Sequence, residues 1–222
     1  TQLEEVLRLA EQISYTAGIA KAKQLLATVS YKTGESEKAL QYILPSVALW
    51  RELENPFELA TALNRLSGPL IDFHEYAAAQ QALEECRDIY QSLGYRRGVA
   101  LAIQNLGGVA YKLGDYARAR ALFCDSLRIR HDLGLQRGYA YSFEFIADVD
   151  EIEKRYERAV QLLAAADTLR VRIGAPLEQS SQKENLDALT RARARLGDVA
   201  YELAWSKGAT LTTEQAIALA LS

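Results

Sequence analysis

Apolar residues recur along the chain with two periods. Within a segment they follow helical spacing, as at Leu3, Val6, Leu7, Ala10 and Ile13. Between segments the same residue types return every 40 positions. Three series show this step: Ala20, Ala60, Ala100, Ala140; Ala39, Ala79, Ala119, Ala159; and Leu53, Leu93, Leu133, Ile173. A fixed period in this range predicts a repeat protein whose units bury their apolar faces against their neighbours.

The unit from 95 to 134 shows the repeat most completely. Its pattern predicts a first helix over 97–113, a turn at Gly114 and Asp115, and a second helix over 116–133. The glycine suits a left-handed helix end, and the aspartate suits a helix start. Gly107 inside the first helix costs about 1 kcal/mol relative to alanine, which indicates close helix packing there. The register of Ser46, Cys86, Ser126 and Ala166 requires small side chains.

We therefore expect an all-α fold, a right-handed superhelical solenoid of antiparallel helix pairs. Residues 1–174 form the array, with a partial repeat at 1–14 and full repeats at about 15–54, 55–94, 95–134 and 135–174. Thr1 falls inside a predicted helix and the sequence contains no methionine, so we expect the natural chain to begin further upstream. Pro69 predicts a kink or an early helix end near 67–69.

Residues 175–222 leave the 40-residue register. A polar helix is predicted to end near residue 196, followed by helices over 198–207 and 213–221. Ser181 with Glu184, and Thr212 with Gln215, have the spacing of capping boxes at two of these helix starts. Because the terminal units of an array are atypical, we interpret this segment as a C-terminal helical cap.

Composition narrows the class of protein. A net charge of -3 and a pI near 5.6 give no electrostatic indication of nucleic-acid binding. The apolar runs are too short to span a bilayer, so we expect a soluble, cytoplasmic protein with no membrane contact. Cys86 and Cys124 fit no ligand spacing, and we interpret both as reduced packing residues.

No catalytic, metal or cofactor motif is recognisable. Gly107 and Gly108 lie inside a predicted helix rather than in a phosphate loop, and His74 and His131 are isolated. The acidic residues Asp148, Asp150, Glu151 and Glu153 lie toward a helix C-terminus, where the helix dipole disfavours anions, so they require solvent or a partner. We interpret Trp50 and Trp205 as packing residues, and the clusters Arg118, Arg120, Arg128, Arg130 and Arg191, Arg193, Arg195 as solvated faces.

Two stretches resemble known families. Leu106, Gly107, Ala110, Gly114, Asp115, Tyr116, Ala119 and Phe123 resemble the tetratricopeptide repeat, although the unit here has 40 residues rather than 34. Residues 158–177 and 196–221 resemble the C-terminal region of bacterial STAND-class signal-transduction ATPases. In that class a nucleotide-cyclase or DNA-binding module precedes an ATPase and a helical repeat array. The resemblance implies that nearly all of this chain is such an array.

The first helices of stacked repeats line the concave face of such solenoids, which implies a partner-binding surface. By this analogy it comprises Gln24, Thr28, Tyr31, Asn64, Gln104, Asn105, Tyr111, Tyr141, Glu144 and Asp148. Amide and phenol groups can hydrogen-bond an extended peptide.

The leading hypothesis is a non-catalytic interaction scaffold, the sensor or partner-binding arm of a larger signalling or transcriptional regulator. Its partner would be a protein, a peptide or another domain of the parent chain, and arrays of this kind can self-associate through their ends. The alternative is a small-molecule receptor with a pocket between the repeats and the C-terminal cap.

Overall fold

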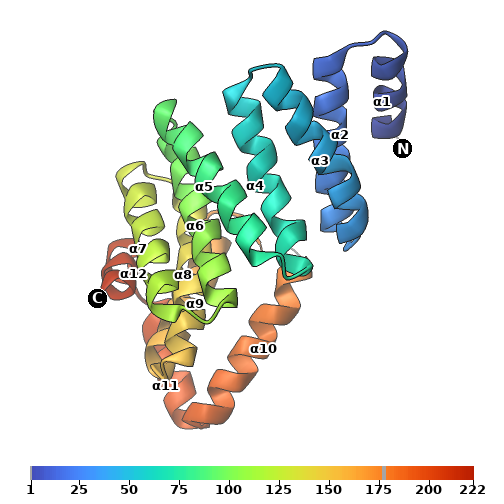
Figure 1. Cartoon of the computed structure of the whole chain (residues 1–222). Coiled ribbons are helices and arrows are strands. Elements are labelled where there is room, and N and C mark those ends of the chain that lie inside the picture. Colours follow the sequence, from blue (N-terminus) through green and yellow to red (C-terminus); the bar gives the residue numbers. More distant parts are fainter. Residues whose placement is uncertain (1, 177–178) are drawn as a thin grey trace. The chain divides into compact units, whose positions relative to one another are not determined.

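The computed structural model describes the backbone of residues 2–176 and 179–222, and the side chains of these residues except 179–185. Over this part the chain folds into helices without strands (Figure 1). The helices are α1 (Gln2–Gln12), α2 (Thr16–Lys32), α3 (Ser36–Glu52), α4 (Pro56–Asp72), α5 (Tyr76–Ser92), α6 (Arg96–Lys112), α7 (Tyr116–Asp132), α8 (Gln136–Ile152), α9 (Tyr156–Arg172), α10 (Gln179–Leu196), α11 (Asp198–Ala209) and α12 (Thr213–Leu221).

The chain divides into two compact units, which we call unit 1 (residues 1–113) and unit 2 (residues 114–222). In unit 1, each of the helices from α1 to α5 packs against the next one along the chain, and α4 also contacts α2 and α6. In unit 2, α7 packs on α8 and α8 on α9, while α11 and α12 both contact α9. The predicted all-α array of helix pairs is thus what the described residues form.

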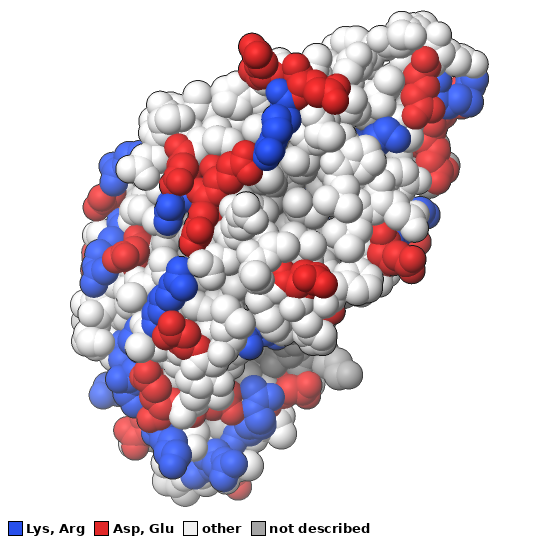
Figure 2. Space-filling view, viewed as in Figure 1, with Lys and Arg blue, Asp and Glu red and all other residues white. Residues whose placement is uncertain are grey.

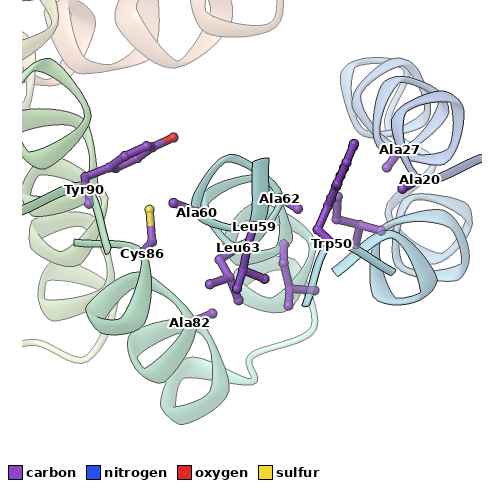
Figure 3. Close-up of a cluster of buried hydrophobic side chains, with 13 residues drawn as sticks. Ala20, Ala27, Trp50, Leu59, Ala60, Ala62, Leu63, Ala82, Cys86 and Tyr90 are labelled. Atoms are coloured by element: carbon purple, nitrogen blue, oxygen red, sulfur yellow. The ribbon is translucent and has the colours of Figure 1, made fainter. Parts of the chain in front are cut away.

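The core of unit 1 is built from second helices inserting large side chains among small ones. Figure 3 shows the ring of Trp50, from α3, between Ala20 and Ala27 of α2 on one side and Ala62 of α4 on the other. Trp50 is 5% exposed, so its predicted packing role is confirmed. The small-residue register is confirmed as well, because Ser46, Cys86, Ser126 and Ala166 are all almost completely buried.

The turns repeat at half the predicted period. A residue with positive φ stands at every twentieth position from Ser14 to Gly174. Glycine fills five of these positions, but Ser14, Glu54, His74 and Lys154 fill the others. The predicted turn at Gly114 is confirmed, with φ of 80°, and Asp115 accepts a hydrogen bond from the Arg118 amide. The four non-glycine turns adopt a backbone conformation that disfavours L-residues.

Pro69 lies inside helix α4 without ending it. The expected early helix end near Pro69 is wrong, because α4 continues to Asp72 and has the same 17 residues as α6. Ser67 and Pro69 are buried, and the Ser67 hydroxyl donates to the Asn64 carbonyl oxygen at 2.8 Å. Packing on both sides therefore holds the helix across the missing N–H.

The C-terminal helices follow the prediction closely. Thr212 and Gln215 form a complete capping box at the start of α12. The helix predicted over 198–207 is α11, which runs two residues longer. The proposed pair Ser181 and Glu184 lies outside the residues whose side chains are described, and α10 begins before it, at Gln179.

Candidate partner-binding surface

The ten predicted surface residues lie on α2, α4 and α6 in unit 1 and on α8 in unit 2. The structure places them in different environments. Gln24 is fully buried and accepts a hydrogen bond from the Trp50 indole at 3.2 Å, and Gln104 is 7% exposed. These two side chains belong to the packing between helices rather than to an open face. Helical spacing could not separate them from the surface, because they lie at the boundary of the apolar stripe.

Three of the predicted residues take part in contacts between neighbouring first helices of unit 1. The Thr28 hydroxyl on α2 accepts a hydrogen bond from the Arg65 guanidinium on α4. Asn105 on α6 donates from Nδ2 to Oδ1 of Asn64 on α4, at 2.9 Å. All four side chains are partly buried. We call Thr28, Asn64, Arg65 and Asn105 the polar strip.

Arg65 is the member that the sequence analysis missed. Its Nη1 reaches only a neutral hydroxyl, and its Nε is buried without a partner among the described residues. No carboxylate in the described part of the chain pairs with this guanidinium. One signal could have identified it: Arg65 is the only charged residue between Glu58 and Asp72.

Apolar side chains border the polar strip. Tyr31 is 41% exposed, and its ring lies so close to Gly68 that a Cβ there would come within 2.7 Å of the ring carbon Cζ. This close approach explains a glycine in the middle of α4. Leu25 on α2 and Leu101 on α6 expose 37% and 39% of their surfaces. Tyr111 on α6 is partly buried.

In unit 2, the predicted residues Tyr141 and Glu144 are engaged by one arginine. Nε and Nη2 of Arg170 donate to the two Glu144 carboxylate oxygens at 2.9 and 2.8 Å, and the guanidinium lies 4.4 Å from the centre of the Tyr141 ring. Burial raises the pKa of Glu144, although the Arg170 hydrogen bonds and charge oppose this shift. Asp148 is partly buried one turn further along α8.

The acidic residues at the end of α8 find partners inside unit 2. Asp150 is 0% exposed and contacts Arg120 at 2.5 Å, Arg155 at 2.8 Å and Arg158 at 3.4 Å. Glu153 also pairs with Arg120 and Arg155. For Asp150, Glu151 and Glu153, the predicted need for solvent or a partner is therefore met by arginines of the same unit.

The interpretation of the arginine clusters as solvated faces is wrong for several members. The side chain of Arg120 is 18% exposed, and Arg130 is 6% exposed as a residue. Burial lowers the pKa of Arg130 to about 10. Arg191 pairs with Glu151 at 2.8 Å, but its side chain is 57% exposed, as expected for a solvated face. Arg120 and Arg191 thus compensate the acidic end of α8, whereas Arg130 donates to the Gly138 carbonyl and the Ser142 hydroxyl.

The space between the last repeat and helix α12 of the cap is almost closed. The space between α8, α9 and α12, lined by Phe143, Leu169 and Ala216 among others, has a volume of about 10 Å³. That is the minimum for one water molecule. The structure therefore offers the small-molecule alternative no support at this place.

Two features are absent from the described residues. No group of three or more histidine, cysteine, aspartate or glutamate side chains is arranged to hold a metal ion. None of the helices combines the length and the apolar character that crossing a membrane demands. On the face shown in Figure 2, acidic and basic side chains are interspersed rather than gathered into an area of one sign.

One segment of the chain matches a known family. Residues 58–132 match the tetratricopeptide repeat family. No curated protein matches the sequence. Among solved structures, BtubC (BKLC) from P. vanneervenii is similar with a TM-score of 0.70 at 16% identity, covering 93% of this chain and 87% of that one.

Two other structures are similar at lower scores. A Rap protein complexed with competence and sporulation factor has a TM-score of 0.58 at 15% identity, over 99% of this chain and 64% of that one. PilF of Pseudomonas aeruginosa has a TM-score of 0.50 at 20% identity, over 92% and 97%. At such identities the likeness concerns the fold alone. The family match and the shared fold together support a tetratricopeptide-repeat array.

Proposed function

We propose that this chain is a non-catalytic interaction scaffold that binds an extended protein segment along the polar strip of unit 1. The single observation that carries the proposal is Arg65, a partly buried cation without a carboxylate partner in the described part of the chain. A buried charge without compensation is costly. A ligand that supplies an anion would remove that cost.

The amides of the polar strip suit the backbone of such a ligand. The Asn64–Asn105 hydrogen bond uses one oxygen and one nitrogen, so the Asn64 Nδ2 and Asn105 Oδ1 atoms remain available as a donor and an acceptor. A peptide backbone offers the complementary pair of groups, and Arg65 adds a preference for an acidic side chain or a terminal carboxylate. Leu25, Tyr31 and Leu101 supply apolar area beside the strip.

The fold class is in keeping with this proposal. Tetratricopeptide arrays commonly present their first helices to protein partners. The similar Rap protein was crystallised with a factor bound. We further propose that the chain is the sensor or partner-binding arm of a larger cytoplasmic regulator. The mass of the native protein in its source cells, measured with an antibody to this chain, tests that part.

Selection from a random peptide library tests the binding proposal. The wild-type chain is expected to enrich peptides that contain aspartate, glutamate or an essential free C-terminus. Arg65→Gln should abolish that enrichment, and Asn105→Leu should weaken the binding of the selected peptides about tenfold, since a lost hydrogen bond to a partner costs about 1–2 kcal/mol.

Arg51→Gln is the matched control, because Arg51 lies in the same unit but is exposed and paired with Glu85 at 2.6 Å. Acid enrichment that survives Arg65→Gln, or falls equally with Arg51→Gln, would show that general charge and not the polar strip selects the ligand.

A further inference from the structure

The C-terminal helix α12 covers surface in unit 2 that is open elsewhere in the array. Cys124 on α7 is 8% exposed, whereas Leu44, which stands at the same repeat position in α3, is 51% exposed. The Cys124 thiol lies 3.7 Å from the Ala220 carbonyl oxygen of α12. Helix α12 contacts α7, α8 and α9, and Figure 1 shows it beside α7. It therefore occupies a groove on these three helices.

The side of α12 that faces the groove is short and made of small residues. Ala216, Ile217 and Ala220 are buried, whereas Ala218 is exposed. Across from Ala216 lie Phe143 of α8 and Leu169 of α9, with a gap of only about 10 Å³ between them. A nine-residue helix is marginal without such contacts, so its order depends on this docking.

Cations of the repeats hold both ends of α12. At its C-terminal end, Arg158 donates to the carbonyl oxygens of Leu219 at 2.8 Å and Ala220 at 3.0 Å. These are carbonyls that a helix end leaves without internal partners, and a cation there complements the helix dipole. At the other end, Arg172 donates to the Thr213 hydroxyl.

Arg158 does not depend on α12 for its position. Its Nη1 lies 3.4 Å from a carboxylate oxygen of Asp150, which is fully buried and also contacts Arg120 and Arg155. The receptor for a helix C-terminus is therefore assembled by α7, α8 and α9 themselves. Since three small or aliphatic side chains and a few polar contacts fix α12, it can open locally at a lower free energy than the repeats unfold.

We propose that α12 is a displaceable occupant of a helix-binding groove on α7, α8 and α9. When it leaves, the groove takes a partner helix with the same pattern: alanine-sized residues at the Ala216 and Ala220 positions, an aliphatic residue at the Ile217 position, and a helix end whose carbonyls reach Arg158. This site is separate from the polar strip and does not rest on the function proposed for that strip.

Alkylation of Cys124 reports the opening of α12 in the full chain. The background variant is Cys86→Ser, which leaves one thiol and is conservative because serine occupies the equivalent positions 46 and 126. Ala220→Lys should raise the rate of Cys124 alkylation by iodoacetamide by about 5- to 150-fold, since overpacking a buried site costs about 1–3 kcal/mol. The far-UV circular dichroism should stay near that of the parent. Ala218→Lys adds the same charge at an exposed position and should leave the rate unchanged.

A synthetic peptide of residues 210–222 then tests the groove itself. Added to the Ala220→Lys chain, it should restore the protection of Cys124 at least tenfold, and much less so when Arg158→Lys is also present, because lysine lacks the forked donor. No protection by the peptide would overturn the helix-binding groove. The proposal would also fail if Ala220→Lys left the rate of Cys124 alkylation unchanged, or if that rate rose only when the whole chain unfolded. Either result would show that α12 is a fixed part of the core.

Discussion

Asp150→Asn tests whether unit 2 depends on its buried charge cluster. Asp150 is 0% exposed, and its carboxylate contacts Arg120, Arg155 and Arg158. Asparagine keeps the shape but removes the negative charge, which leaves Glu153 as the only carboxylate shown in contact with Arg120 and Arg155. Removing one partner of a buried ion pair costs about 3–5 kcal/mol.

The lower end of that range applies here. The side chain of Arg155 is 42% exposed, so water screens part of its charge, whereas Arg120 and Arg158 are 18% and 14% exposed. We expect Asp150→Asn to lower the free energy of unfolding by about 3 kcal/mol. For a chain of this length that corresponds to a decrease in Tm of roughly 6–12 °C.

Urea denaturation followed by circular dichroism, together with calorimetry, measures this effect. Glu153→Gln is the control, since that carboxylate is 32% exposed and its loss should cost less than about 1 kcal/mol. If Asp150→Asn unfolds within about 1 kcal/mol of the parent, the three arginines do not need the carboxylate. The argument for a pre-assembled Arg158 would then fail with it.

Three further predictions concern other parts of the chain. Gly108→Ala should stabilise the chain by about 0.5–1 kcal/mol, since a Cβ there meets nothing within 4 Å. Gly208→Ala should instead destabilise it by about 1–3 kcal/mol, because the added Cβ would come within 2.3 Å of the Gln161 backbone. Urea denaturation measures both changes in the free energy of unfolding. Glu54→Gly, at a φ of 48°, should stabilise unit 1 by about 1 kcal/mol in the same assay, and unchanged stability would refute the strain. Burial raises the pKa of Cys86 from 9.0 to about 12, so the stability that its neutral thiol contributes is complete below pH 9 and is lost as the pH rises toward 12. Cys86→Ser should therefore reduce the loss of unfolding free energy between pH 8 and 10 by about 1.4 kcal/mol. An equal loss of unfolding free energy in the parent and the variant would contradict this.

The fold was predictable from the sequence because it follows from a repeated local pattern. The step of 40 residues placed the second helix of the third pair within one residue of its observed end, and it identified Gly114 as a turn. The 20-residue step of the turns was hidden because Glu54, His74 and Lys154 occupy positions where glycine stands elsewhere. Packing of the flanking helices imposes positive φ on these residues, and the conformational preference of the residues themselves does not predict it.

The surface was less predictable than the fold for a related reason. Gln24 and Asn64 stand at equivalent positions, yet one is fully buried against Trp50 and the other is partly exposed and bonded to Asn105. Position in the repeat fixes the direction of a side chain, but the neighbouring side chains decide whether it is covered. Arg65 became a candidate only when its lack of a carboxylate partner in the described structure was visible.

One position of the second helices explains why the first helices differ in chemistry. At this register stand Trp50, Tyr90, Arg130 and Arg170, and each reaches a first helix. Trp50 donates to Gln24, Tyr90 shares a hydrogen bond with Thr61 at 3.0 Å, Arg130 donates to Ser142 at 2.9 Å and Arg170 pairs with Glu144.

The two arginines of this register lie in unit 2, where Arg170 neutralises Glu144 of α8. The two aromatic residues, Trp50 and Tyr90, lie in unit 1, where they hydrogen-bond the neutral side chains of Gln24 and Thr61. Arg65 in unit 1 thus has no carboxylate partner among the described residues, whereas Glu144 in unit 2 is already paired with Arg170, which is why we assign ligand binding to the first helices of unit 1.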